Sequence, residues 1–215
     1  MADQPETISI KNWTVRLRIP DSPGPHPVLV LLHGLTGDEK VMWIFADRFP
    51  KEYLILSPRG LFDSPLGGYS WRPEKTERLP VIEDFYTAVD GLKDLLTKEN
   101  FPSGIFSTVS LAGFSQGAAL AYAFSLLNPG IVDRVMGLAG FLPDRVGELV
   151  EQQPLAGKSI FVAHGTRDEL VPVWRARQAV ELLTRAGAQV TYCEDDVGHK
   201  LSQGCFRGLE SFFSR

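Results

Sequence analysis

The sequence predicts an α/β fold, in which a mostly parallel central sheet carries helices on both faces. Three observations support this prediction: continuous apolar runs bounded by turn formers, amphipathic segments between them, and a regular alternation of the two along 215 residues. Parallel strands are buried on both faces and need helical crossovers, which is the pattern that such alternation produces. We expect a single domain over residues 1–215.

The elements follow in order along the chain. Residues 8–19, ISIKNWTVRLRI, alternate apolar and polar positions before the turn formers DSPGPHP, which predicts an edge strand or the arm of a hairpin. Buried strands are expected in the apolar runs at 28–32, 53–57, 107–113, 133–140 and 158–165. Helical spacing predicts helices at 39–49, 81–98, 115–127, 172–186 and 203–213.

Two connections interrupt this alternation. Residues 57–80 form a long polar loop that holds Trp71, and loops longer than about 15 residues in compact domains usually have a function or move. The connection from Gly140 to Lys158 has room for only a short helix. We therefore expect no separate cap domain and a site open to solvent on at least one side.

Composition and charge exclude several classes of partner. The 26 acidic and 22 basic residues give a net charge of -4 without any dense Lys/Arg run, which argues against binding to nucleic acid or anionic lipid. No apolar run is long enough to span a bilayer, and the first residues lack a secretion signal, so we expect cytoplasmic residence. Cys193 and Cys205 fit neither a disulfide framework nor a metal-ligand spacing, and we expect two reduced, packed thiols.

The residues 113–117, Gly-Phe-Ser-Gln-Gly, place a serine between a predicted strand and a predicted helix. A nucleophile elbow has this context, because the tight turn strains the serine backbone and requires small residues two positions before and after it. Gly113 and Gly117 meet that requirement. The turn also directs the N-terminus of the following helix toward Ser115, which we predict to be the nucleophile.

A serine hydroxyl needs a neighbouring base, for which histidine has a suitable pKa. The chain has four histidines. His26 lies in a turn rich in proline and glycine, where we expect it to be solvated, whereas His33 and His164 precede glycines at strand ends and favour a structural role. His199 follows the final strand-like segment, which holds Cys193, at the sheet edge where α/β sites assemble. It is our predicted base.

The base needs a carboxylate that orients its ring. Asp168 lies just past the strand predicted at 158–165 and is our candidate, with the adjacent Glu169 expected to point elsewhere. Asp195 and Asp196 are expected in a solvated turn, whereas Asp144 stays open as a rival. The order nucleophile, acid, base along the chain is that of the α/β-hydrolase fold.

The oxyanion of an acyl-transfer intermediate needs preorganised donors. One is expected from the backbone N–H of Gln116, the residue after the nucleophile. The loop HGLTGD at 33–38 follows a predicted strand, and we assign the second donor to the N–H of Leu35. The same loop also fits a glycine turn before a helix capped by Asp38, and the two interpretations are compatible.

The sequence resembles the phospholipase/carboxylesterase family of α/β-hydrolases, which includes the acyl-protein thioesterases and small bacterial carboxylesterases. The resemblance runs over nearly the whole chain and depends on LLHGLTGDE at 31–39, AGFSQGAAL at 112–120, HGTRDELVP at 164–172 and GHKLS at 198–202. It implies a fold without a cap, no cofactor, and hydrolysis of esters or thioesters through an acyl-serine. It also supports the catalytic and oxyanion residues predicted above.

The chain departs from the family pattern at two small residues. Thr36 stands where bacterial members usually have glycine, and Ala118 stands where a third glycine is common after the elbow. The loop at 57–80 matches only loosely, through a tryptophan in roughly the expected place. Substrate choice is therefore the property that the resemblance transfers least.

Large apolar residues near the reactive edge are candidates to line an acyl pocket, with ordinary core packing as the alternative for each. They are Phe62, Leu66, Trp71, Phe114 and Phe141. Their bulk favours a medium or aromatic acyl group. We expect a small-molecule ester as the partner and leave a homodimer open.

Three functions follow from these predictions. The leading one is a serine carboxylesterase acting on small esters. The second is an acyl thioesterase or lysophospholipase acting on long chains. The third is a non-catalytic α/β-hydrolase domain that binds a ligand.

Overall fold

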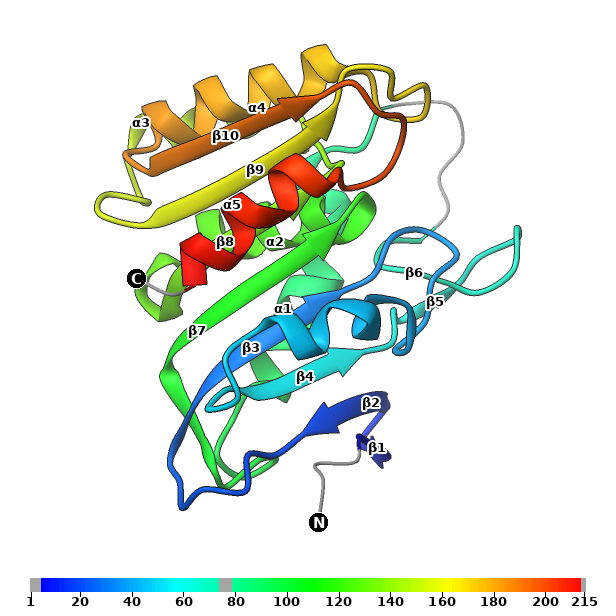
Figure 1. Cartoon of the computed structure of the whole chain (residues 1–215), viewed down its shortest axis with the longest axis vertical. Helices are drawn as coiled ribbons and strands as arrows, with labels where there is room; N and C mark the ends of the chain where they lie inside the picture. Colours follow the sequence, from blue (N-terminus) through cyan, green and yellow to red (C-terminus); the bar gives the residue numbers. More distant parts are fainter. Residues whose placement is uncertain (1–4, 74–78, 214–215) are drawn as a thin grey trace.

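The computed structural model describes residues 5–73 and 79–213, which form one eight-stranded sheet and its covering helices (Figure 1). The strand order is β1-β2-β4-β3-β7-β8-β9-β10. Pairing is antiparallel between β1, β2 and β4 and parallel between all the other neighbours. The strands are β1 (Glu6–Ile10), β2 (Trp13–Arg18), β3 (His26–Leu32), β4 (Leu54–Pro58), β7 (Gly104–Phe114), β8 (Val132–Leu138), β9 (Ser159–Gly165) and β10 (Gln189–Asp195).

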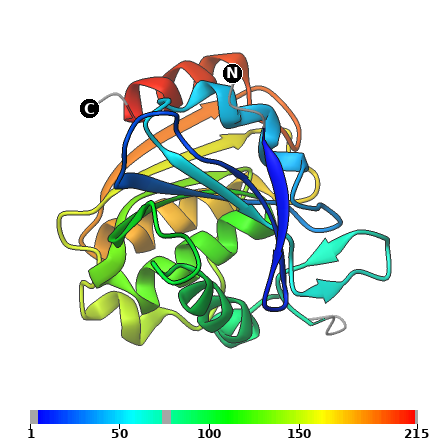
Figure 2. The ribbon, with the colours of Figure 1, turned by 90° about the horizontal axis from the view of Figure 1, so that it is seen from below.

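Helices cover both faces of this sheet. The α-helices are α1 (Tyr86–Leu95), α2 (Gln116–Leu127), α3 (Gly147–Glu151), α4 (Val173–Arg185) and α5 (Gln203–Phe213), and the 3-10 helices are η1 (Val41–Arg48), η2 (Ile82–Phe85) and η3 (Pro129–Ile131). Figure 2 shows α5 and η1 on one side of the sheet and α1 to α4 on the other. The predicted α/β architecture is confirmed.

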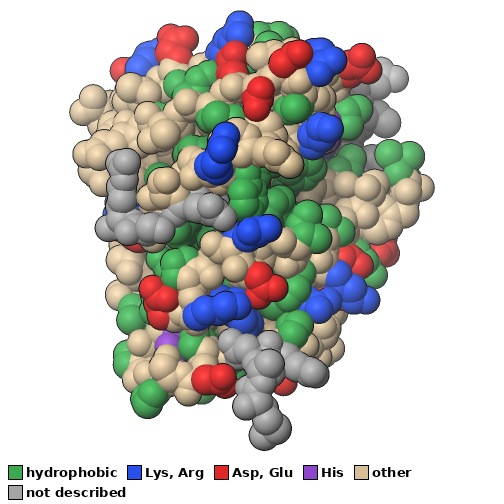
Figure 3. All heavy atoms as spheres, in the orientation of Figure 1, with side chains coloured by type: hydrophobic (Ala, Val, Ile, Leu, Met, Phe, Trp, Pro, Cys, Tyr) green, Lys and Arg blue, Asp and Glu red, His purple; other side chains and the backbone are tan. Residues whose placement is uncertain are grey.

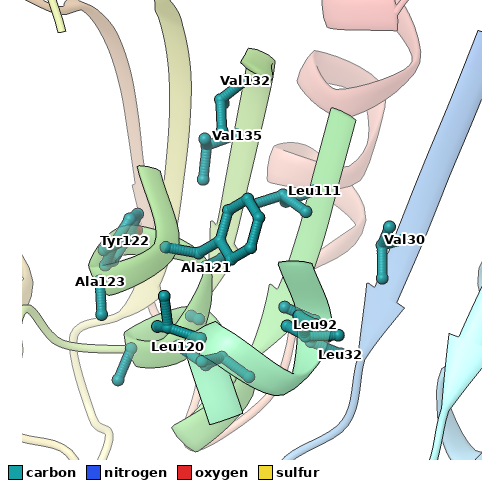
Figure 4. Packing of buried hydrophobic residues seen from close by; sticks show 14 of the residues in the cluster. Val30, Leu32, Leu92, Leu111, Leu120, Ala121, Tyr122, Ala123, Val132 and Val135 are labelled. Carbon is teal, nitrogen blue, oxygen red and sulfur yellow. The ribbon is translucent and has the colours of Figure 1, made fainter. Parts of the chain in front are cut away.

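Strand alternation divides the core into two layers. Successive side chains of a strand point to opposite faces, so Val28, Val30 and Leu32 of β3 join the layer under α1 to α4. Leu29 and Leu31 join the smaller layer under η1 and α5. Figure 4 shows the larger layer, in which buried side chains of α2 pack against β3, β7 and β8. Burial on both faces explains why the central strands are apolar throughout.

Several predicted elements differ in detail. The segment 8–19 crosses a turn at Lys11, whose φ is 52°, and so becomes the hairpin of β1 and β2. The predicted helix at 39–49 is the 3-10 helix η1. The 57–80 loop contains a second hairpin, β5 (Phe62–Asp63) and β6 (Tyr69–Ser70), which projects from the body in Figures 1 and 2. Part of that loop, 74–78, lies outside the described residues. The short helix expected between Gly140 and Lys158 is α3.

The surface carries charges of both signs. Figure 3 shows Lys and Arg side chains interspersed with Asp and Glu side chains on one face, and neither sign dominates it. Within residues 5–73 and 79–213, no helix is both long enough and apolar enough to cross a membrane.

The expectation of two reduced thiols is wrong. Cys193 of β10 and Cys205 of α5 form a disulfide across 12 residues of sequence, with their Cα atoms 5.6 Å apart. Strand and helix lie against each other over this stretch, which brings the two side chains together. The expectation of a solvated His26 is also wrong, because this residue opens β3 and is only 4% exposed. The turn formers precede it and leave its side chain under the strand ends.

The disulfide closes the loop that carries His199, and removing it should destabilise the fold. Replacing both cysteines with alanine, or reducing the protein, should lower the free energy of unfolding by about 3 kcal/mol, because the denatured chain regains the freedom of a loop of this length. Chemical denaturation with and without reductant measures the loss. Reductant added to the double variant is the control, since the chain has only two cysteines. An unchanged midpoint in reductant would contradict the prediction.

Candidate active site

Ser115 occupies the turn between β7 and α2, with a φ of 53° and a ψ of -116°. This backbone conformation is strained for a residue with a side chain. A Cβ on Gly113 would lie 2.2 Å from the carbonyl oxygen of Gly117, and one on Gly117 would lie 2.1 Å from that of Leu32. Only glycine therefore permits the close approach of helix and strands that creates the turn. The local geometry is that of a nucleophile elbow.

His199 and Asp168 form a hydrogen-bonded pair next to this elbow. Nδ1 of His199 lies 2.7 Å from Oδ2 of Asp168, and the imidazole meets the ring of Phe114 edge-on at 5.0 Å between centroids. Oδ1 of Asp168 accepts the backbone N–H groups of Leu170 and Val171, both at 2.9 Å. These contacts fix the buried carboxylate and make Nδ1 of His199 the donor, so its Nε2 is left to accept a proton.

The third contact of the expected triad, a hydrogen bond between Ser115 and His199, is not present among the described residues. Phe114, the neighbour of the serine, does contact the imidazole. Catalytic hydrogen bonds are often long without substrate and shorten when it binds. The structure therefore places the predicted base against Phe114, next to the predicted nucleophile, without a hydrogen bond between base and nucleophile.

His164 is a contributor that the sequence analysis missed. Its side chain is fully buried, and its Nε2–H donates to the carbonyl oxygen of Val171 at 2.8 Å while lying 3.3 Å from Oδ2 of Asp168. The carboxylate oxygen that holds His199 is thus also packed against a second imidazole. The sequence signal was the spacing of four residues between His164 and Asp168 across a turn. This histidine positions the acid.

The alternative carboxylates have other partners. Asp144 pairs with Arg175 at 2.7 Å and not with the predicted base. Asp196 is exposed and pairs with Arg167, and Asp195 accepts the backbone N–H of Asp196. This is the solvated turn that we expected. Of the candidate acids, Asp168 is the one in hydrogen-bond contact with His199.

Leu35 and Gln116, the two residues predicted to supply the oxyanion donors, lie near Ser115. Both residues line the same cavity as Ser115, and neither N–H has a hydrogen-bond acceptor among the described residues. Gln116 is the first residue of α2, so its N–H belongs to the unsatisfied donors of a helix N-terminus. A Cβ on Gly34 would lie 3.3 Å from the Cβ of Ser115, which shows how closely the Leu35 loop approaches the serine.

Thr36 takes the conformation that a glycine would adopt easily. Its φ is 67°, in the left-handed region where a β-branched residue is uncommon. Its N–H donates to the carbonyl of Tyr69 at 3.0 Å, and the N–H of Tyr69 donates to the carbonyl of Gly37 at 3.0 Å. The β6 strand therefore holds the loop in shape, so the departure from glycine leaves the loop geometry supported by its neighbours.

The side chain of Gln116 joins the elbow to the 57–80 loop. Its Oε1 accepts the backbone N–H of Trp71 at 2.8 Å, and its Nε2 donates to the hydroxyl of Ser70 at 3.1 Å. One residue therefore provides a free backbone N–H beside the nucleophile and a buried side-chain link. The long loop is tied to the site at this point.

His33 and Trp71 support the oxyanion loop from below. Nε2 of His33 accepts the N–H of Gly60 at 2.9 Å, which makes Nδ1 the donor to the carbonyl of Gly34 at 2.7 Å. Burial lowers the pKa of His33, which favours this neutral form. The indole N–H of Trp71 donates to the carbonyl of His33 at 2.7 Å, and the two rings lie 4.7 Å apart.

Three cavities surround the elbow. The first, which we call the serine cavity, has a volume of about 220 Å³. It is lined by Leu35, Arg72, Leu79, Pro80, Ser115, Gln116, Phe141, Leu170, Val171, Pro172 and Arg175. The second, the histidine cavity, has about 490 Å³ and is lined by His199 and the segments 167–170 and 197–200. The third, about 360 Å³, lies between η1 and the start of α5 and is mostly apolar.

The five candidates for the acyl pocket separate in the structure. Phe141 lines the serine cavity, whereas Phe114 lines the apolar cavity between η1 and α5. Trp71 is fully buried under the oxyanion loop, and Leu66 is 80% exposed at the tip of the β5-β6 hairpin. Phe62, in β5, lines none of the three cavities. Of the five candidates, Phe141 alone lines the serine cavity, and the buried Trp71 follows the alternative of core packing.

Metal binding has no support in this part of the chain. Within the described residues, no group of three or more His, Cys, Asp or Glu side chains is placed to hold a metal ion.

Several known proteins are similar to this chain over most of its length. The chain is 25% identical to a probable inactive carboxylesterase of Oryza sativa subsp. japonica, over 87% of this chain and 85% of the relative. It is 29% identical to the esterase YpfH of Escherichia coli, over 85% and 79%. The crystal structure of the Bacillus cereus carboxylesterase covers 94% of this chain and 93% of its own at a TM-score of 0.83 and 24% identity, which shows a shared fold.

A family model also matches most of the chain. Residues 19–215 match the model of the family described as Phospholipase/Carboxylesterase. That range includes the elbow, the Asp168–His199 pair and the loop of Leu35. The chain therefore belongs to the phospholipase/carboxylesterase family.

Proposed function

We propose that this chain is a serine carboxylesterase that cleaves carboxylic esters through an acyl-serine intermediate. The observation that carries the proposal is the hydrogen-bonded pair of His199 and Asp168 beside the strained elbow of Ser115. The unpaired N–H groups of Leu35 and Gln116 on the same cavity supply the second requirement of acyl transfer. Nucleophile, base, acid and oxyanion donors are thus all available.

The reaction proceeds in two halves. Nε2 of His199 accepts the proton of Ser115 as its oxygen attacks the ester carbonyl, and the N–H groups of Leu35 and Gln116 bind the oxyanion. The alkoxide leaves with the proton from His199, and the acyl group stays on the serine. Water then enters, and His199 takes a proton from it as the water oxygen attacks the acyl carbonyl. The second tetrahedral intermediate breaks the bond to Ser115, whose oxygen receives that proton from His199, and the acid is released.

Asp168 supports both halves without changing its own charge. Its carboxylate accepts Nδ1–H of His199, which holds the tautomer that leaves Nε2 free, and stabilises the imidazolium that forms. Two backbone N–H groups and the packing of His164 keep the carboxylate in place. A fixed acid means that no reorganisation is needed when charge develops on the imidazole.

The cavities assign the two halves of the substrate. The leaving group must be near His199 to receive its proton, and His199 lines the histidine cavity. The acyl group stays bonded to Ser115, which lines the serine cavity. We therefore place the acyl group in the serine cavity and the alcohol toward the histidine cavity.

The size of the serine cavity favours a small acyl group over a long one. Its volume of about 220 Å³ is below the range of about 300–1,000 Å³ that is common for pockets of drug-sized ligands. The family description also covers phospholipases, so a lysophospholipase or an acyl thioesterase for long chains is the alternative. The cavity volume favours the carboxylesterase.

A non-catalytic role has two observations in its favour. One relative bears the name of a probable inactive carboxylesterase, and the hydrogen bond between Ser115 and His199 is open. Against this role stand the complete set of reacting groups and the strained serine, which a binding domain would not require.

Two further predictions concern the setting of the protein. Cytoplasmic residence and the open alternative of a homodimer both stay predictions. The disulfide argues against cytoplasmic residence, because thiols in the cytosol are usually kept reduced.

The serine should react with a fluorophosphonate. We expect one adduct, located on Ser115 by peptide mapping, because only a base-activated serine next to oxyanion donors attacks such a reagent at an appreciable rate. Intact-mass analysis measures the adduct, and Ser115→Ala is the matched control that should neither label nor turn over esters. A folded wild-type protein without an adduct would contradict the catalytic proposal and favour the binding role.

The acid should be Asp168 and not Asp144. Asp168→Asn should lower kcat by about four orders of magnitude, because the amide favours the wrong tautomer of the base. Asp144→Asn is the matched control, since it removes the partner of Arg175 and should act mainly on thermal stability. Steady-state ester hydrolysis and melting curves of both variants measure the two effects. A comparable loss of kcat in Asp144→Asn alone would reverse the assignment.

Acyl-chain length should discriminate the esterase from the long-chain enzymes. Along a series of p-nitrophenyl esters from acetate to palmitate, kcat/KM should be highest for short chains and should fall by about tenfold or more for laurate and longer, because the serine cavity cannot bury them. The matching thioesters control for the leaving group. A maximum at palmitate would favour the thioesterase or lysophospholipase.

A further inference from the structure

Arg72 lies at the wall of the serine cavity, and the described residues leave its guanidinium Nε without a hydrogen-bond partner. Its side chain lines this cavity together with Ser115, Gln116 and Phe141. Its Nε is buried and has no hydrogen-bond partner, and its side chain forms no hydrogen bond or ion pair with the rest of the described chain. A buried donor without an acceptor carries a free-energy penalty that a bound acceptor would relieve.

The backbone fixes Arg72 close to the nucleophile. The hydroxyl of Ser70 donates to the carbonyl of Arg72 at 2.8 Å, and the same hydroxyl is bonded to the side chain of Gln116. The N–H of the preceding residue, Trp71, also donates to Gln116 at 2.8 Å. Arg72 is 43 positions from Ser115 in sequence, yet it is held two hydrogen bonds from the residue that follows the serine.

Among the described residues that line the serine cavity, positive charge is in excess. Its lining residues include two arginines and no carboxylate among the described residues. Arg175 is already neutralised, because its guanidinium pairs with Asp144 at 2.7 Å and also donates to the carbonyl of Leu142. Arg72 is therefore the cation that remains available to a ligand.

The free Nε is the atom that a side-on carboxylate would use. In this chain, Arg59 holds Glu39 in that way, with Nε and Nη2 donating at 2.7 and 3.1 Å to the two carboxylate oxygens. Arg177 holds Glu194 in the same way at 2.7 and 2.8 Å. Such bidentate contacts are among the strongest hydrogen bonds in proteins and match the planar geometry of a carboxylate.

From these observations we propose that Arg72 binds a carboxylate at the far end of the acyl group, so that the preferred substrates are half-esters of dicarboxylic acids. The inference depends on the proposed esterase function and on the placement of the acyl group in the serine cavity. The cavity volume of about 220 Å³ suits a short diacid, and the cation at its wall selects the charged chain over the neutral one.

The test compares charged and neutral esters of equal chain length. Monoethyl succinate, glutarate and adipate are paired with ethyl butanoate, pentanoate and hexanoate, so that a carboxylate replaces a methyl group in each pair. In at least one pair, kcat/KM should be higher for the charged ester by about tenfold or more, mainly through a lower KM. Proton release in a pH-stat measures both members without a chromophore.

Variants of Arg72 connect this preference to the guanidinium. Arg72→Gln should lower the ratio of charged to neutral kcat/KM by about tenfold or more, and Arg72→Lys should restore part of it, because an ammonium keeps the charge without the bidentate geometry. Arg185→Gln is the matched control. It removes an exposed arginine of α4, which pairs with Glu151 at the end of α3, and it should leave the ratio unchanged. A wild-type ratio near one in every pair, or an unchanged ratio in Arg72→Gln, would overturn the inference.

A binding measurement separates this inference from the esterase proposal. Calorimetry of the Ser115→Ala variant with each half-ester measures recognition without turnover. Binding that is lost when Arg72→Gln is added supports the role of Arg72, even if the wild type hydrolyses no ester and the esterase proposal fails. Absence of binding to Ser115→Ala in all three cases overturns the inference, even if neutral esters are hydrolysed and the esterase proposal holds.

Discussion

The close approach of α2 to the ends of β3 and β7 is the constraint on which the rest of the site depends. At Gly113 and Gly117, a single additional carbon would lie within about 2.2 Å of a backbone carbonyl oxygen. With both glycines in place, the helix N-terminus meets the strand ends, and Ser115 is forced into its strained conformation between them. The position of the nucleophile and the direction of the free N–H of Gln116 both follow from this single contact.

A network of buried polar groups transmits that position to the surrounding loops. The side chain of Gln116 accepts a hydrogen bond from the backbone N–H of Trp71. The indole N–H of Trp71 donates to the carbonyl of His33. His33 in turn donates to the carbonyl of Gly34, one residue before the Leu35 donor. The oxyanion loop, the elbow and the 57–80 loop therefore form one hydrogen-bonded unit, in which the donors that we propose would be in place before substrate binds.

The same unit explains why Arg72 is exposed to the serine cavity. Its neighbour Trp71 is fully buried and fixed on both sides by hydrogen bonds, so the next residue must emerge at the cavity wall. Catalysis and selectivity thus share a support. The groups that would bind the oxyanion and the group that we propose to bind the distal carboxylate are positioned by the same few contacts.

Local periodicity, glycine spacing and the topology of parallel sheets were enough to predict the main alternation of strands and helices, the elbow, and the base and acid candidates. The turn at Lys11, the 3-10 form of η1 and the β5-β6 hairpin were not predicted. Which carboxylate meets His199 depended on the tertiary structure, since Asp144 and Asp168 both follow strands and differ in their distant partners, Arg175 and His199. The same holds for the pairing of Cys193 with Cys205, the burial of His26 and Trp71, and the Nε of Arg72 that has no partner among the described residues. Each of these depends on contacts between segments far apart in the chain, about which local patterns carry no information.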